Sequence, residues 1–314
     1  MSIAKAGKMN DLLKNKAKLE LNEDPEQIEA YLKSLRRWLV TVKYIKCPNT
    51  REFLLPFLRH SKYNLVKAEE RIDNYCTLIK SPVYGKPEWF HRLENAEHLR
   101  IFKSLMTHIP LGFLGDDGPL VMLFRFGKFD YSLLPQEYLT NGIHMITEYF
   151  LRMPRVQISG SIALMDCSQM NSRILKQMND TESNKIMTRW FQDSLPMRMK
   201  GLYYFNEPEA FHALFKVFSV FLTEKVKSRI TFCGKDFDKV KKKIPGIEKI
   251  LPKEYQGNAG TLEELTDKFY DSMLEYNKTH PDYEISIDES KRETKPSLQK
   301  YENTGAYVKT TDEF

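Results

Sequence analysis

The sequence predicts a mixed α/β fold, in which a largely parallel sheet is flanked by helices and preceded by an all-α N-terminal helical domain. Up to about residue 100, apolar side chains recur at helical spacing, as at Ile28, Leu32 and Leu35. From Pro119 onward, short apolar segments typical of strands alternate with longer amphipathic segments. Strands and helices that alternate in this way form βαβ crossovers, which place the strands parallel.

The helices of the N-terminal domain are predicted from their start signals. Asp24 followed by Pro25 predicts the start of a helix over "EQIEAYLKSLRRWLVTVKYI". Thr50 is expected to cap "REFLLPFLRH", and Asn64 is expected to cap "LVKAEERIDNYCTLI". Short helices with facing apolar stripes indicate a small bundle.

The second part is expected to contain four strands and four helices. The strands are expected at residues 119–127, 158–166, 199–206 and 229–234. The helices are expected at residues 135–153, 182–195, 210–222 and 261–276. The chain then divides into a basic N-terminal extension (1–23), a helical domain (24–100), an α/β domain (101–277) and a polar tail expected to be disordered (278–314).

The composition is that of a globular protein and excludes several classes. Hydrophobic residues make up 41% of the 314 residues and charged residues 29%, which allows a substantial core. A net charge of +6 is too small to indicate nucleic acid, but a concentrated positive patch would fit an anionic surface. The N-terminal segment "MSIAKAGKMNDLLKNKAK" is broken by lysines and is not expected to act as a signal peptide, and no apolar run reaches the roughly 18 residues that a membrane helix needs. We expect an intracellular, cytoplasmic protein that meets membranes only at their surface.

No arrangement of residues in the sequence predicts catalysis or metal binding. The glycines of residues 112–119 precede a strand, whereas a phosphate-binding loop follows a strand and opens a helix. Asp166 ends a predicted strand and is interpreted as a cap for the next loop, and His144 and His212 as structural histidines. The four cysteines are not spaced as zinc ligands and are expected to be reduced. We therefore expect no enzyme activity, no cofactor and no metal.

The segment "FNEPEAFHALFKVFSVFLTEKVKSRI" is unusually apolar for a helix of a globular protein. Phe211, Leu214 and Phe218 belong to a broad stripe, and further apolar residues extend it most of the way around the helix. One interpretation is a crossover helix buried in the core. The other is a helix that closes over a hydrophobic ligand and also meets lipid. If the helix continued, Lys225 and Arg229 would follow on the side of the stripe, as on a surface that lies on an anionic membrane.

Several motifs, in the same order, resemble the CRAL-TRIO lipid-transfer family. They are "FLRHSKYNLVKAEERI", "LPMRMKGLYYFNEPEAFHALFKVFSVFLTEKVKSRI" and "ILPKEYQGNAGTLEEL". The resemblance extends over about residues 25–275 and is greatest to the branch of the α-tocopherol transfer, retinaldehyde-binding and clavesin proteins. It implies a CRAL-TRIO lipid-binding domain with a hydrophobic pocket and a mobile lid helix at residues 207–226.

The resemblance also implies a basic patch that grips phosphatidylinositol bisphosphate and triggers the exchange of cargo. A basic position of the family in "FLRHSK" falls at Ser61, which is a departure, and the neighbouring Lys62 is expected to compensate. The residues expected to bind the phosphoinositide are Lys62, Arg198, Lys200, Lys225, Lys227 and Arg229.

The pocket positions implied by the resemblance are bulky in this sequence. Of two hydroxyl positions on the helix "YLTNGIHMITEYF", one is Thr147 and the other has become Ile143. The residues expected to line the lipid pocket are Ile143, Thr147, Leu164, Trp190, Phe191, Leu195, Phe211, Leu214, Phe215, Val217 and Phe218. Each of them has ordinary core packing as its alternative role.

These observations predict a monomeric carrier that binds a tocopherol-, retinoid- or isoprenoid-like lipid and exchanges it at phosphoinositide-bearing endosomal, Golgi or plasma membranes. A lipid-sensing adaptor without transfer activity is one alternative. A lipid-modifying α/β enzyme is another, and it would require turnover of the bound lipid.

Overall fold

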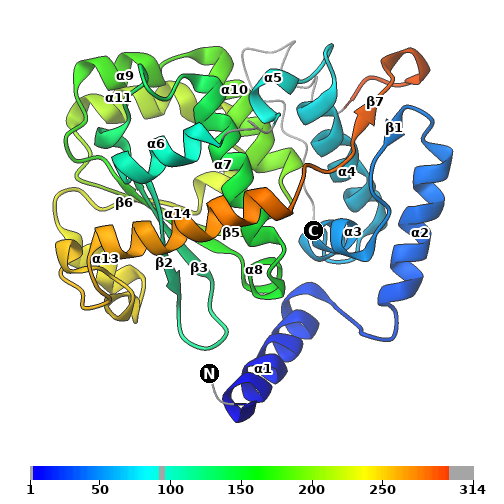
Figure 1. The fold of residues 1–314 in the computed structure, drawn as a ribbon, viewed down its shortest axis with the longest axis horizontal. Coiled ribbons are helices and arrows are strands. Elements are labelled where there is room, and N and C mark those ends of the chain that lie inside the picture. Colours follow the sequence, from blue (N-terminus) through cyan, green and yellow to red (C-terminus); the bar gives the residue numbers. More distant parts are fainter. Residues whose placement is uncertain (1–2, 92–95, 297–314) are drawn as a thin grey trace.

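The computed structural model describes residues 3–91 and 96–296. A helical N-terminal part lies beside an α/β part, and α1 extends from the bottom of the molecule in Figure 1. The helices of the N-terminal part are α1 (Ile3–Leu21), α2 (Ile28–Thr41), α3 (Arg51–His60), α4 (Leu65–Lys80) and α5 (Pro87–Phe90).

Two of the three predicted helix starts are confirmed. The side chain of Thr50 accepts a hydrogen bond from the backbone N–H of Phe53, and that of Asn64 accepts one from the N–H of Lys67. The start predicted at Asp24 is wrong, because the Asp24 side chain instead accepts from the N–H of Glu26 in a turn. Helix α2 therefore begins three residues later than an N-cap at Asp24 would place it.

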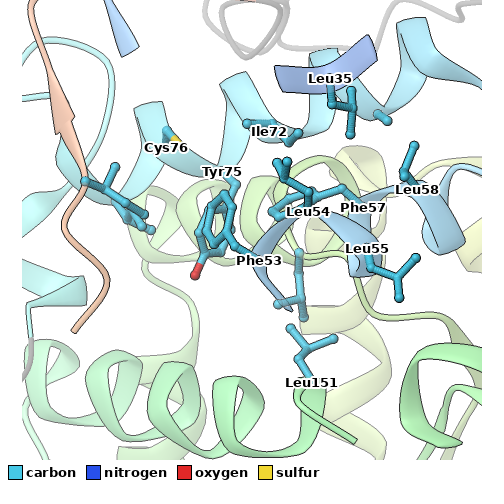
Figure 2. Packing of buried hydrophobic residues seen from close by; sticks show 14 of the residues in the cluster. Leu35, Phe53, Leu54, Leu55, Phe57, Leu58, Ile72, Tyr75, Cys76 and Leu151 are labelled. Carbon is cyan, nitrogen blue, oxygen red and sulfur yellow. The ribbon is translucent and has the colours of Figure 1, made fainter. Parts of the chain in front are cut away.

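The core of the N-terminal part is built around α3. Figure 2 shows side chains of α3, among them Phe53 and Phe57, packed against Ile72 and Tyr75 of α4. Leu151 of the α/β part joins the same cluster (Figure 2). The two parts therefore share apolar packing and are not connected by a linker alone.

The α/β part contains a five-stranded sheet of order β2-β3-β4-β5-β6. Its strands are β2 (His108–Phe113), β3 (Leu120–Arg125), β4 (Ser161–Asp166), β5 (Met199–Phe205) and β6 (Ile230–Phe232). The pairs from β3 to β6 are parallel, as predicted, and β2 pairs antiparallel with β3. Strand β2 was not predicted, because Pro110 and Gly112 interrupt the pattern of a strand; the proline is tolerated here because β2 is an edge strand.

The helices of the α/β part cover the sheet. They are α6 (Glu97–Leu105), α7 (Gln136–Leu151), α8 (Pro154–Ser159), α9 (Ser172–Met178), α10 (Thr181–Arg189), α11 (Glu209–Phe218), α12 (Glu224–Lys227), α13 (Phe237–Lys243) and α14 (Leu262–Thr279). A π-helical turn, Trp190–Ser194, extends α10. None of the helices in the described part of the chain is long and apolar enough to cross a bilayer.

The segment after α14 returns to the N-terminal part, and this differs from the predicted disordered tail. Strand β7 (Ser286–Ile287) pairs antiparallel with β1 (Ile45–Lys46), and the two lie together in Figure 1. The Arg292 side chain is 3% exposed and pairs with Asp73 at 3.0 Å, with its guanidinium 4.0 Å from the centroid of the Tyr44 ring. This segment was predicted to be disordered because it contains few aliphatic residues. The polar and aromatic contacts of Arg292 hold it in place instead. Residues 297–314 of the predicted tail lie outside the described residues.

The ion pairs of Arg292 predict a measurable contribution of this segment to stability. Arg292→Ala should lower the free energy of unfolding by about 3 kcal/mol, because the variant leaves the partly buried Asp73 without its cation. The neighbouring Lys291→Ala removes an exposed pair with Asp288 and should cost about 0–1 kcal/mol. Urea unfolding of both variants measures the difference, and equal midpoints would contradict a structural role of Arg292.

Candidate functional site: an apolar cavity beside a basic cluster

A cavity of about 270 Å³ lies between one face of the sheet and the helices α7, α10 and α11. Its walls are mostly apolar and aromatic, as is common for sites that take hydrophobic small molecules. Seven of the eleven residues predicted for the lipid pocket line it: Ile143, Phe191, Leu195, Phe211, Leu214, Phe215 and Phe218.

The sheet contributes alternate side chains to this cavity. Ala163 and Met165 of β4 and Tyr204 of β5 line it, because successive residues of a strand point to opposite faces. Leu164 lies between two of these residues and therefore points to the other face, where it packs with Leu123 and Val240. The prediction that Leu164 lines the pocket is therefore wrong, because the residues directly before and after it on β4 face the cavity.

Helix α11 forms the wall of the cavity opposite the sheet. Phe211 and Phe215 approach the Tyr204 ring, with centroid distances of 5.3 and 5.9 Å. Val217 lies on the other side of α11 and is 58% exposed, so it does not line the cavity as predicted. One face of α11 thus closes the cavity while the other carries an apolar residue into solvent.

The predicted lid segment, residues 207–226, is two helices and not one. Helix α11 ends at Phe218, a 3₁₀ turn follows, and Leu222 is extended before Thr223 caps α12. The side chain of Gln192 spans this break: it donates to the carbonyl of Phe221 at 3.0 Å and accepts from the N–H of Thr223 at 2.7 Å. Lys225 and Arg229 therefore do not continue the stripe of α11, which corrects the assumption of a continuous helix.

Two other predicted pocket residues belong to neighbouring cores. Trp190 is fully buried and packs against the rings of Phe90 and His144, because the π turn directs it toward the N-terminal part. The Thr147 hydroxyl donates to the carbonyl of Ile143 at 2.7 Å, within its own helix, and does not line the cavity. Phe191, next to Trp190, lines the cavity and is 39% exposed, so it stands where the cavity meets the surface.

Several lining residues were not predicted, and those with polar side chains include His108, Thr188, Gln136, Gln177, Ser183, Asn184 and Gln192. His108 begins β2, the strand that was not predicted. Burial lowers the pKa of His108 to about 3, so its imidazole is neutral at neutral pH. Thr188 lies on α10 two residues before Trp190, and only its position in the folded helix shows that it faces the cavity.

A basic cluster lies at one side of the cavity, between the two parts of the molecule. We define it as Arg71, Arg198, Lys225 and Arg229, whose positive charges add to burial in lowering the pKa of His60 well below its usual value. Arg229 also lines the cavity, and its guanidinium donates to the carbonyl of Met199. Three of the four cations were predicted, and Arg71 was not.

The other predicted phosphoinositide residues are Lys62, Lys200 and Lys227. Lys200 lies on β5, two residues after Arg198, Lys227 pairs with Glu224 at 3.0 Å, and Lys62 is an exposed residue with a φ of 51°. Ser61, the departure from the family pattern, is buried. Compensation of Ser61 by the exposed Lys62 stays a prediction.

Helix α1 carries Glu20, which pairs with Arg198 of the basic cluster and with the neighbouring Lys200. A carboxylate oxygen of Glu20 lies 2.9 Å from Arg198 and 2.8 Å from Lys200. Burial opposes ionisation of Glu20, but the hydrogen bonds from Lys200 and Arg198 outweigh it and lower its pKa to about 2. Leu13, Ala17 and Leu21 hold α1 against Ile158 of α8. Glu20 is thus held, ionised, at the edge of the basic cluster.

Asp166, His144 and His212 make contacts of a structural kind. Asp166 accepts a hydrogen bond from the N–H of Ser168 at 2.9 Å, as predicted for a cap, and another from the Tyr255 hydroxyl. His144 is buried beside Glu148, and His212 lies on the exposed side of α11 near Glu207. Within residues 3–91 and 96–296, no group of three or more His, Cys, Asp or Glu side chains is placed to hold a metal ion.

Comparison with known proteins agrees with this architecture. Clavesin-2 of Homo sapiens is 26% identical over 302 residues, covering 91% of this chain and 87% of that protein. Alpha-tocopherol transfer protein-like of Homo sapiens is 28% identical over 257 residues, covering 81% and 72%. Clavesin-1 of Xenopus laevis is 25% identical over 279 residues, covering 86% and 81%. The crystal structure of Sfh5 aligns with a TM-score of 0.48 and 10% identity over 82% of this chain and 99% of that one, a similarity too low to bear on function.

The α/β part carries the most specific match. The family model of the CRAL/TRIO domain matches residues 108–257, which begin at β2 and include the whole sheet, α11 and α12. The same residues supply most of the walls of the cavity. This part of the chain is therefore similar to the CRAL/TRIO domain.

Proposed function

We propose that the protein is a carrier that encloses one hydrophobic lipid in the cavity and exchanges it at membranes containing phosphoinositides. The observation that carries this proposal is the apolar cavity closed by α11, with the basic cluster beside it. The names of the relatives, which include a tocopherol transfer protein-like protein, support a lipid as the cargo. The domain resemblance supports binding and transport, without covalent chemistry, as the activity.

The apolar residues of α11 keep the cavity closed in water. Phe211, Phe215 and Phe218 face the cavity, and a phenylalanine buries about 150–250 Å². Exposing about half of this area, with that of Leu214, costs on the order of 5–10 kcal/mol at ~25 cal/mol/Å². A lipid surface removes most of that cost, because the same side chains then meet acyl chains. Opening is therefore expected at a membrane.

The break at Leu222 gives this opening a hinge. Helix α11 can move while α12 and the basic cluster stay on the headgroups, because an extended residue at a helix end absorbs changes in backbone angle. Gln192 must release Phe221 and Thr223 for this motion, so it acts as a latch.

Filling the cavity should abolish cargo binding. Leu214→Trp places an indole in the cavity and should reduce several-fold the lipid that mass spectrometry detects in the organic extract of the purified protein. Val217→Trp is the matched control, because it makes the same kind of change on the exposed side of the same helix.

Three results would contradict the carrier proposal. Equal lipid content in the two variants would place the cargo elsewhere. Cargo that binds but does not move between vesicles would favour an adaptor. Recovery of a chemically altered lipid after incubation would favour an enzyme.

The basic cluster should determine membrane binding. Lys225→Ala combined with Arg229→Ala should weaken binding to vesicles containing phosphatidylinositol bisphosphate about 30-fold, since each cation near an anionic surface contributes about 1 kcal/mol. Cosedimentation with vesicles measures this. Lys242→Ala with Lys243→Ala removes the same charge from the exposed end of α13 and should have a smaller effect. Equal losses would show a general charge effect and not a site.

Glu20 should compete with the headgroup for Arg198 and Lys200. Glu20→Gln removes the internal carboxylate and should strengthen binding to the same vesicles about fivefold, the effect of ~1 kcal/mol. Asp11→Asn removes an equal charge from a more exposed position of α1 and is the control. Weaker binding by Glu20→Gln would mean that the docked position of α1 supports the headgroup site.

A further inference from the structure

The π turn that extends α10 is held by a side chain of the N-terminal part. A helix leaves its last carbonyl groups without partners of its own, and the turn Trp190–Ser194 forms the end of this one. Arg71 of α4 supplies donors to this end. Its guanidinium donates to the carbonyl of Gln192 at 2.8 Å and to that of Leu195 at 3.1 Å. The backbone of the turn is thus fixed by a residue more than 100 positions away in the chain.

The same turn holds the lid segment through the side chain of Gln192. That side chain donates to the carbonyl of Phe221 and accepts from the N–H of Thr223, on either side of the break at Leu222. The backbone of Gln192 is therefore bound by α4, while its side chain binds the segment between α11 and α12. A movement of this backbone also moves the side-chain amide, so the hold on the lid segment depends on Arg71.

Arg71 also belongs to the basic cluster. Its charge and those of the other three members lower the pKa of His60 well below its usual value. Cations gathered in this way attract a group that carries several negative charges. Arg71 thus connects the region that favours an anion with the turn that holds the lid segment.

An anion competes with the two carbonyl groups for the guanidinium of Arg71. The oxygens of a phosphate match the fork of an arginine, and a charge-assisted hydrogen bond is about twice as strong as one between neutral groups. Binding of a phosphate therefore withdraws donors from Gln192 and Leu195. The end of the helix then loses the contacts that fix it, and a helix end without such contacts opens locally.

We propose that Arg71 is a positioning residue that couples binding of a phosphate-bearing lipid headgroup to release of the lid segment by Gln192. This inference rests on the proposed function and adds the contacts through which the basic cluster acts on α11. In water, Arg71 fixes the π turn, and Gln192 bridges the break at Leu222. At a membrane, the phosphate groups take the guanidinium, and Gln192 releases Phe221 and Thr223.

The backbone amide of Thr223 reports this release, because its N–H donates to Gln192. Amide hydrogen exchange of the full chain can be followed by NMR, with and without a saturating concentration of inositol trisphosphate as a soluble headgroup. Exchange at Thr223 should become faster on the order of fivefold, as expected for the loss of one hydrogen bond. The amide of Lys67, which donates to Asn64 at the start of α4, is the internal control and should not change.

Arg71→Lys keeps the positive charge but loses the fork that spans two carbonyl groups. The variant should show the faster exchange at Thr223 without any headgroup, and inositol trisphosphate should cause little further change. Arg36→Lys is the matched control, because Arg36 also donates to a carbonyl, that of Asn49, and it should respond as the wild type does. Gln192→Leu removes both bonds to the lid segment. Adding Arg71→Lys to Gln192→Leu should not change the exchange further, because the two residues act in series.

Calorimetric titration with inositol trisphosphate separates this inference from the proposed function. If the wild-type protein does not bind the headgroup, the phosphoinositide part of the proposed function fails together with the inference. If it binds but exchange at Thr223 stays the same, the coupling is wrong and the headgroup site stands. If Arg71→Lys still responds as the wild type does, Arg71 is not the coupling residue.

Inorganic phosphate at the same concentration distinguishes a headgroup from a free anion. An equal effect of inorganic phosphate on Thr223 would contradict a response to membranes. Should Arg71→Lys not fold, the wild-type protein with and without inositol trisphosphate, compared with Gln192→Leu, decides the result.

Discussion

The alternation of side chains along the parallel strands is the constraint on which the site depends. Residues at even positions of β4, such as Ile162 and Leu164, pack into the core behind the sheet. Those at odd positions, Ala163 and Met165, line the cavity. Because β3 and β5 are paired in parallel register with β4, the same division extends across the sheet. The core on one face therefore supports the floor of the cavity on the other face, and α11 forms the wall opposite this floor.

The interruption of the lid segment links this cavity to the basic cluster. Arg229 belongs to both, and Val226 of α12 lines the cavity that α11 closes. The extended residue Leu222 separates the apolar helix from the cationic one. Under the proposed function, recognition of headgroups would belong to α12 and exposure of apolar side chains to α11, with Leu222 as the hinge between them. A single rigid helix would have to lift its cations from the membrane in order to open.

Local signals in the sequence predicted much of the fold, but contacts between distant segments were beyond them. Thr50 shows what local chemistry predicts well, because its capping partner is three residues away. Strand β2 forms by pairing with β3. The ordered structure of residues 280–296 depends on contacts with the N-terminal part, which is more than 200 residues away along the chain. Leu164 was wrongly predicted to line the cavity, and its neighbours Ala163 and Met165 line it instead. A motif match does not show which face of a strand is turned toward a cavity. The prediction that Trp190 lines the cavity failed because of the π turn at Trp190–Ser194, which no local pattern in the sequence indicated.

The pairing of Glu20 with the basic cluster has a consequence for which headgroups can bind. The Glu20 carboxylate carries one negative charge and pairs with both Arg198 and Lys200. Because it belongs to the same chain, its effective concentration at these cations is high. A lipid with one phosphodiester gains little by displacing it. A headgroup with added phosphate groups brings several charges and more acceptors. Under the proposed function, the internal carboxylate would therefore raise the charge that a membrane must offer, which would favour multiply phosphorylated lipids over singly charged ones.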